Sequence, residues 1–196
     1  MSKDIRFKKG ANLNLIGKAE KSINNKSKSD LFALQPNDFF SLTPKLLVRE
    51  GDLVSKGSAV FHDKNNISIN FVSPVSGVVD KIIRGPKRRI ESVIIKKEGE
   101  RVLNHILPKK LNRDIIVKFL TKSGCWPFIK QRPYNVIANP NDTPKSILVS
   151  CFTSAPLDVD FDFFLAKNKD DFQSGISILN QLIEGEVILT IDHNPN

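Results

Sequence analysis

The hydrophobic pattern of residues 39–104 consists of short apolar runs separated by turns rich in Gly, Pro, Asp and Ser. Ile67, Ile69 and Phe71 alternate with polar neighbours, which is the period-2 pattern of a half-buried strand. KLLVR and SAVFHD flank the turn EGDLVSKG, ISINFVS and VVDKIIR flank PVSG, and IESVIIKK follows the hairpin RGPKR. The two glycines of the first turn are expected to adopt positive φ. The pattern predicts a small all-β barrel or sandwich.

Residues 1–38 precede this barrel and lack a regular period. The segment FKKGANLNLIGKAEKSINNKSKS is polar and rich in turn-forming residues. We expect residues 1–38 to form an irregular arm that wraps the barrel.

Residues 105–196 show helical periodicity, and their first helix is expected in LNRDIIVKFLTKSG. Asn112 is a candidate N-cap and Gly124 a C-terminal stop. The apolar positions of one face are Ile115, Ile116, Phe119 and Leu120. A proline-bearing loop, CWPFIKQRPYNVIANPNDTP, follows this helix.

A strand–helix–strand unit is expected at the end of the chain. KSILVSCF is a continuous apolar run, typical of a strand covered on both faces. After a loop, NKDDFQSGISILNQLIEG predicts a helix that Asn168 caps and Gly185 ends, and EVILTI is the next strand. A parallel crossover follows, but two strands cannot complete an open sheet. We therefore expect an α+β, multidomain chain whose residues 105–196 form an incomplete, truncated Rossmann-like α/β unit.

The charge distribution suggests what the protein contacts. The formal net charge is +9, and residues 1–155 hold 28 Lys and Arg against 13 Asp and Glu, whereas residues 156–196 hold 2 against 8. The densest basic run, RGPKRRIES, has no aromatic residues interleaved with it, so nucleic-acid binding is not expected. The run predicts a solvated hairpin tip or a surface that docks on an acidic partner or an anionic membrane.

The sequence gives no sign of a membrane-spanning, secreted or metal-binding protein. No apolar run approaches the roughly 18 residues of a membrane span, and MSKDIRFKKG lacks the apolar core of a secretory signal, so we expect a cytoplasmic protein. Cys125 and Cys151 are too few for a zinc or iron–sulfur site and are expected to be buried thiols. His62, His105 and His193 lie far apart, so no metal ligands are assigned.

Lys64 is the candidate attachment site of a carrier domain, because the predicted barrel resembles lipoyl and biotinyl domains. HDKNNISINFVSP contains the Asp63–Lys64 pair, but Ser73 lies nine residues beyond the lysine rather than about seven. The methionines of a biotinyl motif are absent, since the sole Met is Met1. A carrier modified on Lys64 remains the alternative function, and a barrel used only as a structural module is favoured.

Five longer stretches resemble the NqrA family, which supplies one subunit of the sodium-translocating NADH:quinone reductase. They are FKKGANLNLIGKAE, TPKLLVREGDLVSKGSAVFHDKN, FVSPVSGVVDKIIRGPKRRIESVII, SGCWPFIKQRPYNVI and DTPKSILVS with SAPLDVD. The resemblance covers nearly the whole chain, and the pair RGPKRRIESVII and WPFIKQRPY is its most specific part. Members of this family extend well beyond residue 196, with a further β-grasp-like module and a helical region.

This resemblance implies a peripheral subunit on the cytoplasmic face of the bacterial inner membrane. The complex as a whole couples electron transfer from NADH to quinone with sodium export, and other subunits hold the NADH, flavin and iron–sulfur sites. The implied partners are those subunits, quinone and the membrane surface. The fragment alone is expected to be inactive.

The segment from Ser123 to Tyr134 departs from a related redox subunit, which carries a glycine-rich flavin loop there. Glycines let backbone N–H groups approach a phosphate, and this stretch has only Gly124 beside Trp126 and Phe128. We therefore expect no bound cofactor and assign no catalytic, cofactor-binding or metal-binding residue. The aromatic side chains are expected in the core or at an interface rather than around a quinone ring. A nucleotide on the strand–helix–strand unit is disfavoured by the acidic loop TSAPLDVDFDF.

Overall fold

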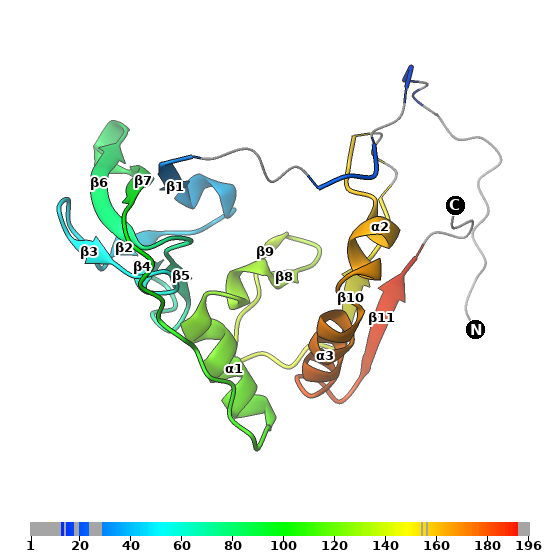
Figure 1. The fold of residues 1–196 in the computed structure, drawn as a ribbon. Helices are drawn as coiled ribbons and strands as arrows, with labels where there is room; N and C mark the ends of the chain where they lie inside the picture. Colours follow the sequence, from blue (N-terminus) through cyan, green and yellow to red (C-terminus); the bar gives the residue numbers. More distant parts are fainter. Residues whose placement is uncertain are drawn as a thin grey trace.

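The computed structural model describes residues 13, 15–17, 20–23, 29–153, 155 and 157–191, and its elements form a β-rich part followed by a part that holds the helices (Figure 1). The first part contains β1 (Leu31–Leu34), β2 (Pro44–Leu46), β3 (Leu53–Val54), β4 (Ala59–Asp63), β5 (Asn70–Val72), β6 (Gly77–Arg84) and β7 (Ile90–Lys97). The second contains α1 (Arg113–Ser123), β8 (Lys130–Gln131), β9 (Val136–Ile137), β10 (Ser146–Ser150), α2 (Phe161–Ala166), α3 (Lys169–Asn180) and β11 (Glu186–Thr190).

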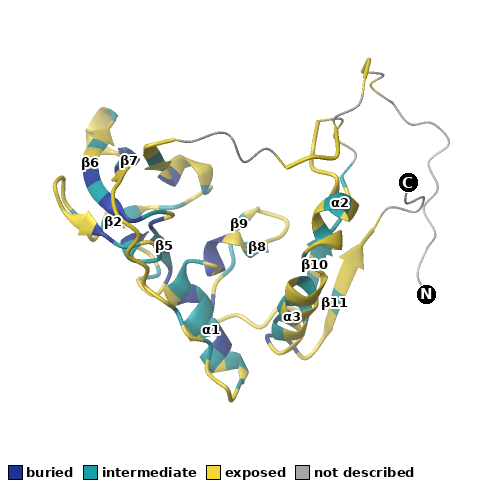
Figure 2. Cartoon of the chain, in the orientation of Figure 1, coloured by how far each residue is buried: buried dark blue, intermediate teal, exposed yellow. Residues whose placement is uncertain are grey.

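Two antiparallel sheets build the first part, one in the order β1-β7-β6-β3 and the other in the order β2-β4-β5. Their inward-facing side chains form the main core, which Figure 2 shows in dark blue. Phe61 and Phe71 stack in it with ring centroids 4.7 Å apart. The core also includes Val54, Val60, Ile69, Val79, Ile90, Val93 and Ile95. The predicted barrel or sandwich is confirmed.

Strand β1 lies within the expected irregular arm, residues 1–38, and differs from that expectation. It pairs antiparallel with β7, with Phe32 opposite Ile95. This pairing satisfies backbone groups that an edge strand β7 would leave open. The sheet of the barrel therefore begins before Phe39, and residues 1–12 of the arm lie outside the described residues.

Glycines allow the close turns of the barrel. Gly51 and Gly57 have φ of 88° and 87°, in agreement with the sequence prediction. At Gly77, a side-chain Cβ would collide with the carbonyl oxygen of Lys96. The absence of a side chain at Gly77 therefore lets β6 approach β7 closely where the long hairpin begins.

The ends of helix α1 match the sequence prediction. The side chain of Asn112 accepts a hydrogen bond of 2.9 Å from the backbone N–H of Ile115. Gly124 adopts the left-handed conformation with φ of 78°, and its N–H donates to the carbonyl of Leu120. Ile116, on the inner face, is fully buried.

Strands β10 and β11 pair in parallel, which confirms the predicted strand–helix–strand crossover. The expected helix boundaries were wrong in part. α3 ends at Asn180, and the chain then turns so that Leu182 and Ile183 enter the core. Gly185 therefore does not end the helix. Its lack of a side chain allows close approach to Lys145 beside β10, because a Cβ there would collide with the Lys145 carbonyl oxygen.

Two local features of this unit were not predicted. The short helix α2 occupies part of the segment expected to be a loop, and Asp160 caps it. Asn168 stands at the N-cap position of α3, but its side-chain amide donates to the carbonyl of Phe164 instead of capping α3. The sequence could not distinguish these roles, because Asn both donates and accepts hydrogen bonds.

The β10–β11 sheet also differs from the expected doubly covered strand. Side chains of β10 alternate between half-buried and exposed. Leu148 is 66% exposed and its parallel neighbour Ile188 is 41% exposed. Among the described residues, α3 packs against this pair of strands and the opposite face is open.

The connection between the two parts follows the barrel surface. Lys56 and Val102 form a parallel bridge, and the His105 ring nitrogen Nε2 lies 2.8 Å from the carbonyl oxygen of Gly57. Among the helices of the described residues, none has the length and apolar character that a membrane span needs.

Candidate functional site: the junction of α1 and the barrel

The loop after α1 is held tightly against the barrel. A Cβ on Gly124 would lie 2.6 Å from Cγ2 of Val72 in β5, so the helix stop is also a point of close packing. Gly124 thus has two reasons to be glycine, its positive φ and its contact with β5. The contact fixes the direction in which residues 125–134 leave the helix.

Trp126 is a packing residue of this junction. It begins a short 3-10 turn, is 4% exposed, and its indole N–H donates a hydrogen bond of 2.7 Å to the carbonyl oxygen of Ala138. Pro127 beside it is fully buried. The expectation that Trp126 packs in the core is confirmed, because its ring is enclosed and its one polar group is satisfied.

Phe128 behaves differently from Trp126 and is 74% exposed. Its ring centroid lies 6.1 Å from that of Phe39, which in turn packs edge-on against Phe71 at 4.8 Å. The Nζ atom of Lys130 lies 4.6 Å from the centre of the Phe39 ring. We call Phe39, Phe71, Phe128 and Lys130 the aromatic cluster. Phe128 is its solvent-facing member.

The electrostatics of the aromatic cluster centre on Lys130. Partial burial lowers the pKa of this amine, because the charged form loses hydration. The ammonium group faces the electron-rich side of the Phe39 ring, which partly compensates that loss. In such a cluster the exposed ring can stack against a planar ring of a ligand, and the ammonium group can donate a hydrogen bond to an oxygen of that ligand.

Sequence analysis missed this cluster for a physical reason. Phe39 belongs to the barrel, whereas Phe128 and Lys130 follow α1, so only the fold brings them together. The β8–β9 hairpin, which carries Lys130, lies in the segment expected as a proline-bearing loop. The aromatic residues of WPF were the available signal, but it did not separate the buried Trp126 from the exposed Phe128.

Lys64 lies in the connection between β4 and β5, as expected for a loop. Its backbone N–H donates to the carbonyl of Thr43, and the Asp63 carboxylate accepts from the N–H of Asn65. A further turn closes at Ile69, whose N–H donates to Asn66. The lysine thus follows directly after β4 and is not presented at the tip of a tight two-residue hairpin.

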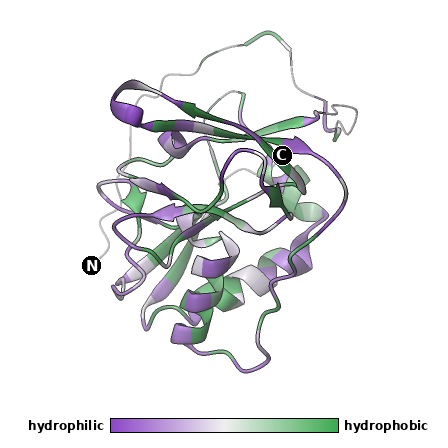
Figure 3. Cartoon of the chain, turned by 90° about the vertical axis from the view of Figure 1, so that its left-hand side faces the viewer, coloured by the Kyte–Doolittle hydropathy of each residue, from purple (hydrophilic) through white to green (hydrophobic). Residues whose placement is uncertain are grey.

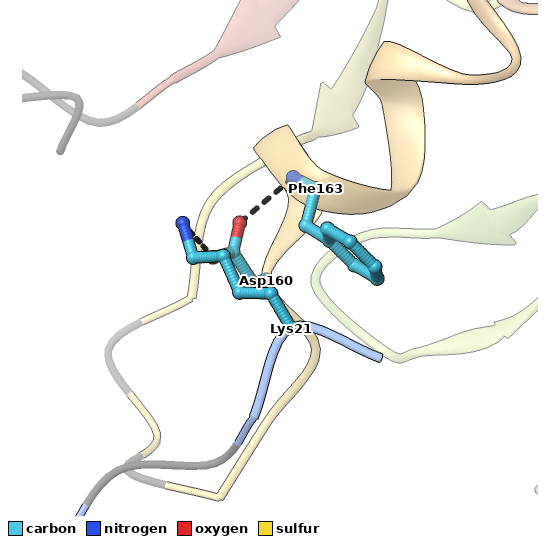
Figure 4. Close-up of polar contacts among 3 residues, drawn as sticks. All are labelled: Lys21, Asp160 and Phe163. Atoms are coloured by element: carbon cyan, nitrogen blue, oxygen red, sulfur yellow. Dashed lines mark hydrogen bonds and ion pairs between the residues drawn. The ribbon is translucent and has the colours of Figure 1, made fainter. Parts of the chain in front are cut away.

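A small cavity of about 140 Å³ lies where β10 ends, the edge at which open α/β sheets bind ligands. The Nζ atom of Lys21 lies 3.0 Å from Oδ2 of Asp160, whose Oδ1 accepts a hydrogen bond of 2.9 Å from the N–H of Phe163 (Figure 4). Both contacts, the backbone hydrogen bond first, lower the pKa of Asp160. The pKa of Asp158 is lowered chiefly by the N–H of Val159.

This cavity is poorly suited to a nucleotide. Its volume is well below the roughly 300 Å³ at which ligand pockets begin. Carboxylates of Asp160 and Asp162 line it, and they would repel a phosphate. Burial raises the pKa of Cys151, another lining residue, so its thiol is not activated.

The remaining candidate ligands do not come together. His62 is buried in β4, with Nδ1 2.9 Å from the carbonyl of Asp63, and His105 contacts Gly57. Cys125 is exposed, contrary to the expected burial, and Cys151 is partly exposed. Within the described ranges, no three His, Cys, Asp or Glu side chains are grouped as metal ligands. His193 lies outside those ranges.

The fold defines a class of protein, a carrier-type β barrel joined to an α/β domain. Residues 5–98 match the family model of the NqrA N-terminal barrel-sandwich hybrid domain, and residues 111–196 match that of the NqrA second alpha/beta domain. The chain belongs to the NqrA family.

Curated relatives of the chain are named as the A subunit of the Na(+)-translocating NADH-quinone reductase. The protein from Histophilus somni (strain 129Pt) is 36% identical over 94% of this chain and 43% of its own length. That from Glaesserella parasuis is 32% identical over 98% of this chain and 44% of its own length. The protein from Pasteurella multocida is 34% identical over 94% of this chain and 43% of its own length. The chain thus spans less than half the length of these relatives.

Proposed function

We propose that this chain is a peripheral, cytoplasm-facing part of a sodium-pumping NADH:quinone reductase and organises its neighbours without holding a redox cofactor. In this proposal, other subunits carry the NADH, flavin and iron–sulfur sites, and the fragment alone is inactive. The family membership and the relatives' names support the subunit role. Surface charge supports attachment beside an acidic subunit or anionic lipid.

One observation carries the cofactor-free part of the proposal. Trp126 and Pro127 fill the space directly after α1, where a coenzyme phosphate would need exposed backbone N–H groups. Gly124, the sole glycine of the segment, ends helix α1 and packs against Val72, so its backbone is not free to line a phosphate site. The start of the segment is therefore packed into the core and leaves no open phosphate cradle after α1.

The direct test is the visible spectrum of the purified chain, together with its NADH oxidation rate. We expect no flavin band and no oxidation of NADH with an artificial acceptor. Flavin recovered in stoichiometric amount after protein denaturation would contradict the proposal. Activity that appears only with other subunits present would support it.

A second candidate role, contact with the quinone, is favoured by the aromatic cluster. Phe128 presents an exposed ring, and both this ring and the amine of Lys130 lie against Phe39. The ring could stack on a quinone ring while the amine donates to a quinone carbonyl oxygen. This role needs no resident cofactor and is compatible with the first proposal.

Replacing Phe128 by alanine tests the quinone role. Loss of one stacking ring, worth about 1 kcal/mol, should weaken binding of a water-soluble short-chain quinone about fivefold. Quenching of Trp126, the sole tryptophan, reports binding. Phe164→Ala, which removes an exposed ring from α2, is the matched control and should leave affinity unchanged. Equal effects of the two variants, or none, would exclude the cluster as a quinone contact.

A further inference from the structure

An open groove lies on the barrel between the β2–β3 connection and the outer half of β6. Its cavity volume is about 570 Å³. The lining residues are Leu46, Val48, Arg49, Glu50, Ile82 and Arg84. The groove exists because β3 is short and pairs only with the start of β6, Val54 with Gly77 and Leu53 with Val78. Backbone hydrogen bonds of Gly51 and Asp52 with Val79 extend this pairing, and beyond Val79 no described strand covers this edge of β6.

The groove has an apolar floor and cationic sides. Leu46, Val48 and Ile82 are partly buried against the core, so their outer surfaces form the floor. Arg49 and Arg84 are exposed beside it. Neither guanidinium group is among the ion pairs found in the described residues. The groove therefore offers apolar contact and positive charge together.

Glu50 is the one acid in the lining, and it is already engaged. Its Oε1 atom accepts a hydrogen bond of 2.7 Å from the backbone N–H of Ile82. This carboxylate thus occupies a donor on the β6 edge, in the position where a neighbouring strand would place a carbonyl oxygen. A backbone carbonyl of an extended segment would pair with Ile82 by displacing this carboxylate.

The hairpin turn beyond the groove adds positive charge. Lys87 and Arg88 are exposed and adopt positive φ of 56° and 60°, and Arg89 is exposed beside them. Arg89 pairs with Glu91, with Nη2 and Oε1 3.8 Å apart. Figure 3, viewed from the barrel side, shows the outer end of this hairpin as hydrophilic and the strands behind it as partly hydrophobic.

We propose that this groove docks an extended acidic segment of a partner polypeptide, laid along the open edge of β6. Alternating side chains of an extended segment point to opposite sides, so apolar residues meet the floor while carboxylates reach Arg49 and Arg84. The guanidinium group of arginine donates bidentate hydrogen bonds to carboxylates. A flat anionic membrane fits less well, because lipid headgroups supply no row of backbone groups that could pair with the β6 edge.

A direct test uses a short fluorescent peptide of alternating Glu and Val, titrated into the chain and followed by anisotropy. We expect saturable binding, and no binding of the counterpart in which Lys replaces Glu. Arg49→Glu with Arg84→Glu should weaken binding on the order of tenfold or more, since two charge-assisted contacts become repulsive. The matched control, Lys109→Glu with Lys110→Glu, reverses the same charge between β7 and α1 and should leave affinity within about twofold.

Hydrogen exchange locates the peptide independently of the variants. Bound peptide should slow exchange in residues 46–50 and 80–84 and leave α1 unchanged. Absence of saturable binding, equal loss in both double variants, or protection elsewhere would overturn the proposal. So would binding to phosphatidylglycerol vesicles through the same two arginines without peptide binding. These results are separable from the subunit role, which spectra and NADH oxidation test.

Discussion

Single residues decide how the junction between α1 and the barrel is built, and Gly124 is the clearest case. Its φ of 78° and its contact with Val72 both exclude a side chain. Trp126 and Pro127 depend on this geometry, because they follow the same turn into the core. Phe128 is then directed outward, next to Phe39.

Replacing Gly124 by alanine should destabilise the chain by about 1–3 kcal/mol, because the left-handed conformation is strained and Val72 must shift. Urea unfolding measures the change. Gly175→Ala is the matched control: this glycine lies inside α3 with no heavy atom within 4 Å of an added Cβ. The control should stabilise by about 0.5–1 kcal/mol. A neutral effect at Gly124 would contradict the packing described here.

Secondary-structure elements were predictable where the pattern was local. The β6–β7 hairpin and α1 were anticipated, since alternation, the Asn112 cap and the Gly124 stop are encoded within each segment. β1 was missed because its pairing with β7 is a long-range contact. α2 was missed because FDFFLA is short and lies in an acidic stretch.

The capping of α2 by Asp160 makes this element pH-dependent. The pKa of Asp160 is depressed in the folded chain, so the cap and the Lys21 ion pair are present above the usual carboxyl range and are lost as pH falls through the depressed pKa. The protection factor of the α2 amides, which is the observed exchange rate corrected for the intrinsic pH dependence of amide exchange, should therefore fall in acid. Asp160→Asn keeps a capping side chain and should flatten this pH dependence, leaving the part due to Asp158.

A matched control for this experiment is Asp80→Asn, an exposed carboxylate on β6. Its substitution should leave the exchange profile of α2 unchanged. If the α2 protection factors of Asp160→Asn and of the parent chain fell identically in acid, the cap would not be the source of the pH dependence.

At the scale of the whole molecule, Arg113 joins α1 to the strand–helix–strand unit. Its guanidinium group donates to the carbonyls of Leu182, Pro140 and Asp142 at 3.2, 3.2 and 2.7 Å. The sequence pattern does not predict that Arg113 joins these elements, because the three acceptors are backbone carbonyls from two separate loops. The aromatic cluster also joins residues that are far apart in sequence. The sequence therefore showed that aromatic residues are present, but not that they meet.

Replacing Arg113 by alanine should cost about 1–3 kcal/mol, since three carbonyls lose their donor. Thermal unfolding should become less cooperative as α1 and the strand–helix–strand unit separate. Lys118→Ala on the exposed side of α1 is the control and should change stability by less than about 0.5 kcal/mol. An unchanged, single transition in the Arg113 variant would show that other contacts hold α1 and the strand–helix–strand unit together.

Calorimetric titration of the purified chain with FMN, and separately with NADH, tests the central claim most directly. Because Trp126 and Pro127 fill the segment after α1, we expect no saturable heat with either coenzyme. Saturable one-to-one binding, weakened by substitutions at Trp126 or Phe128, would contradict the account.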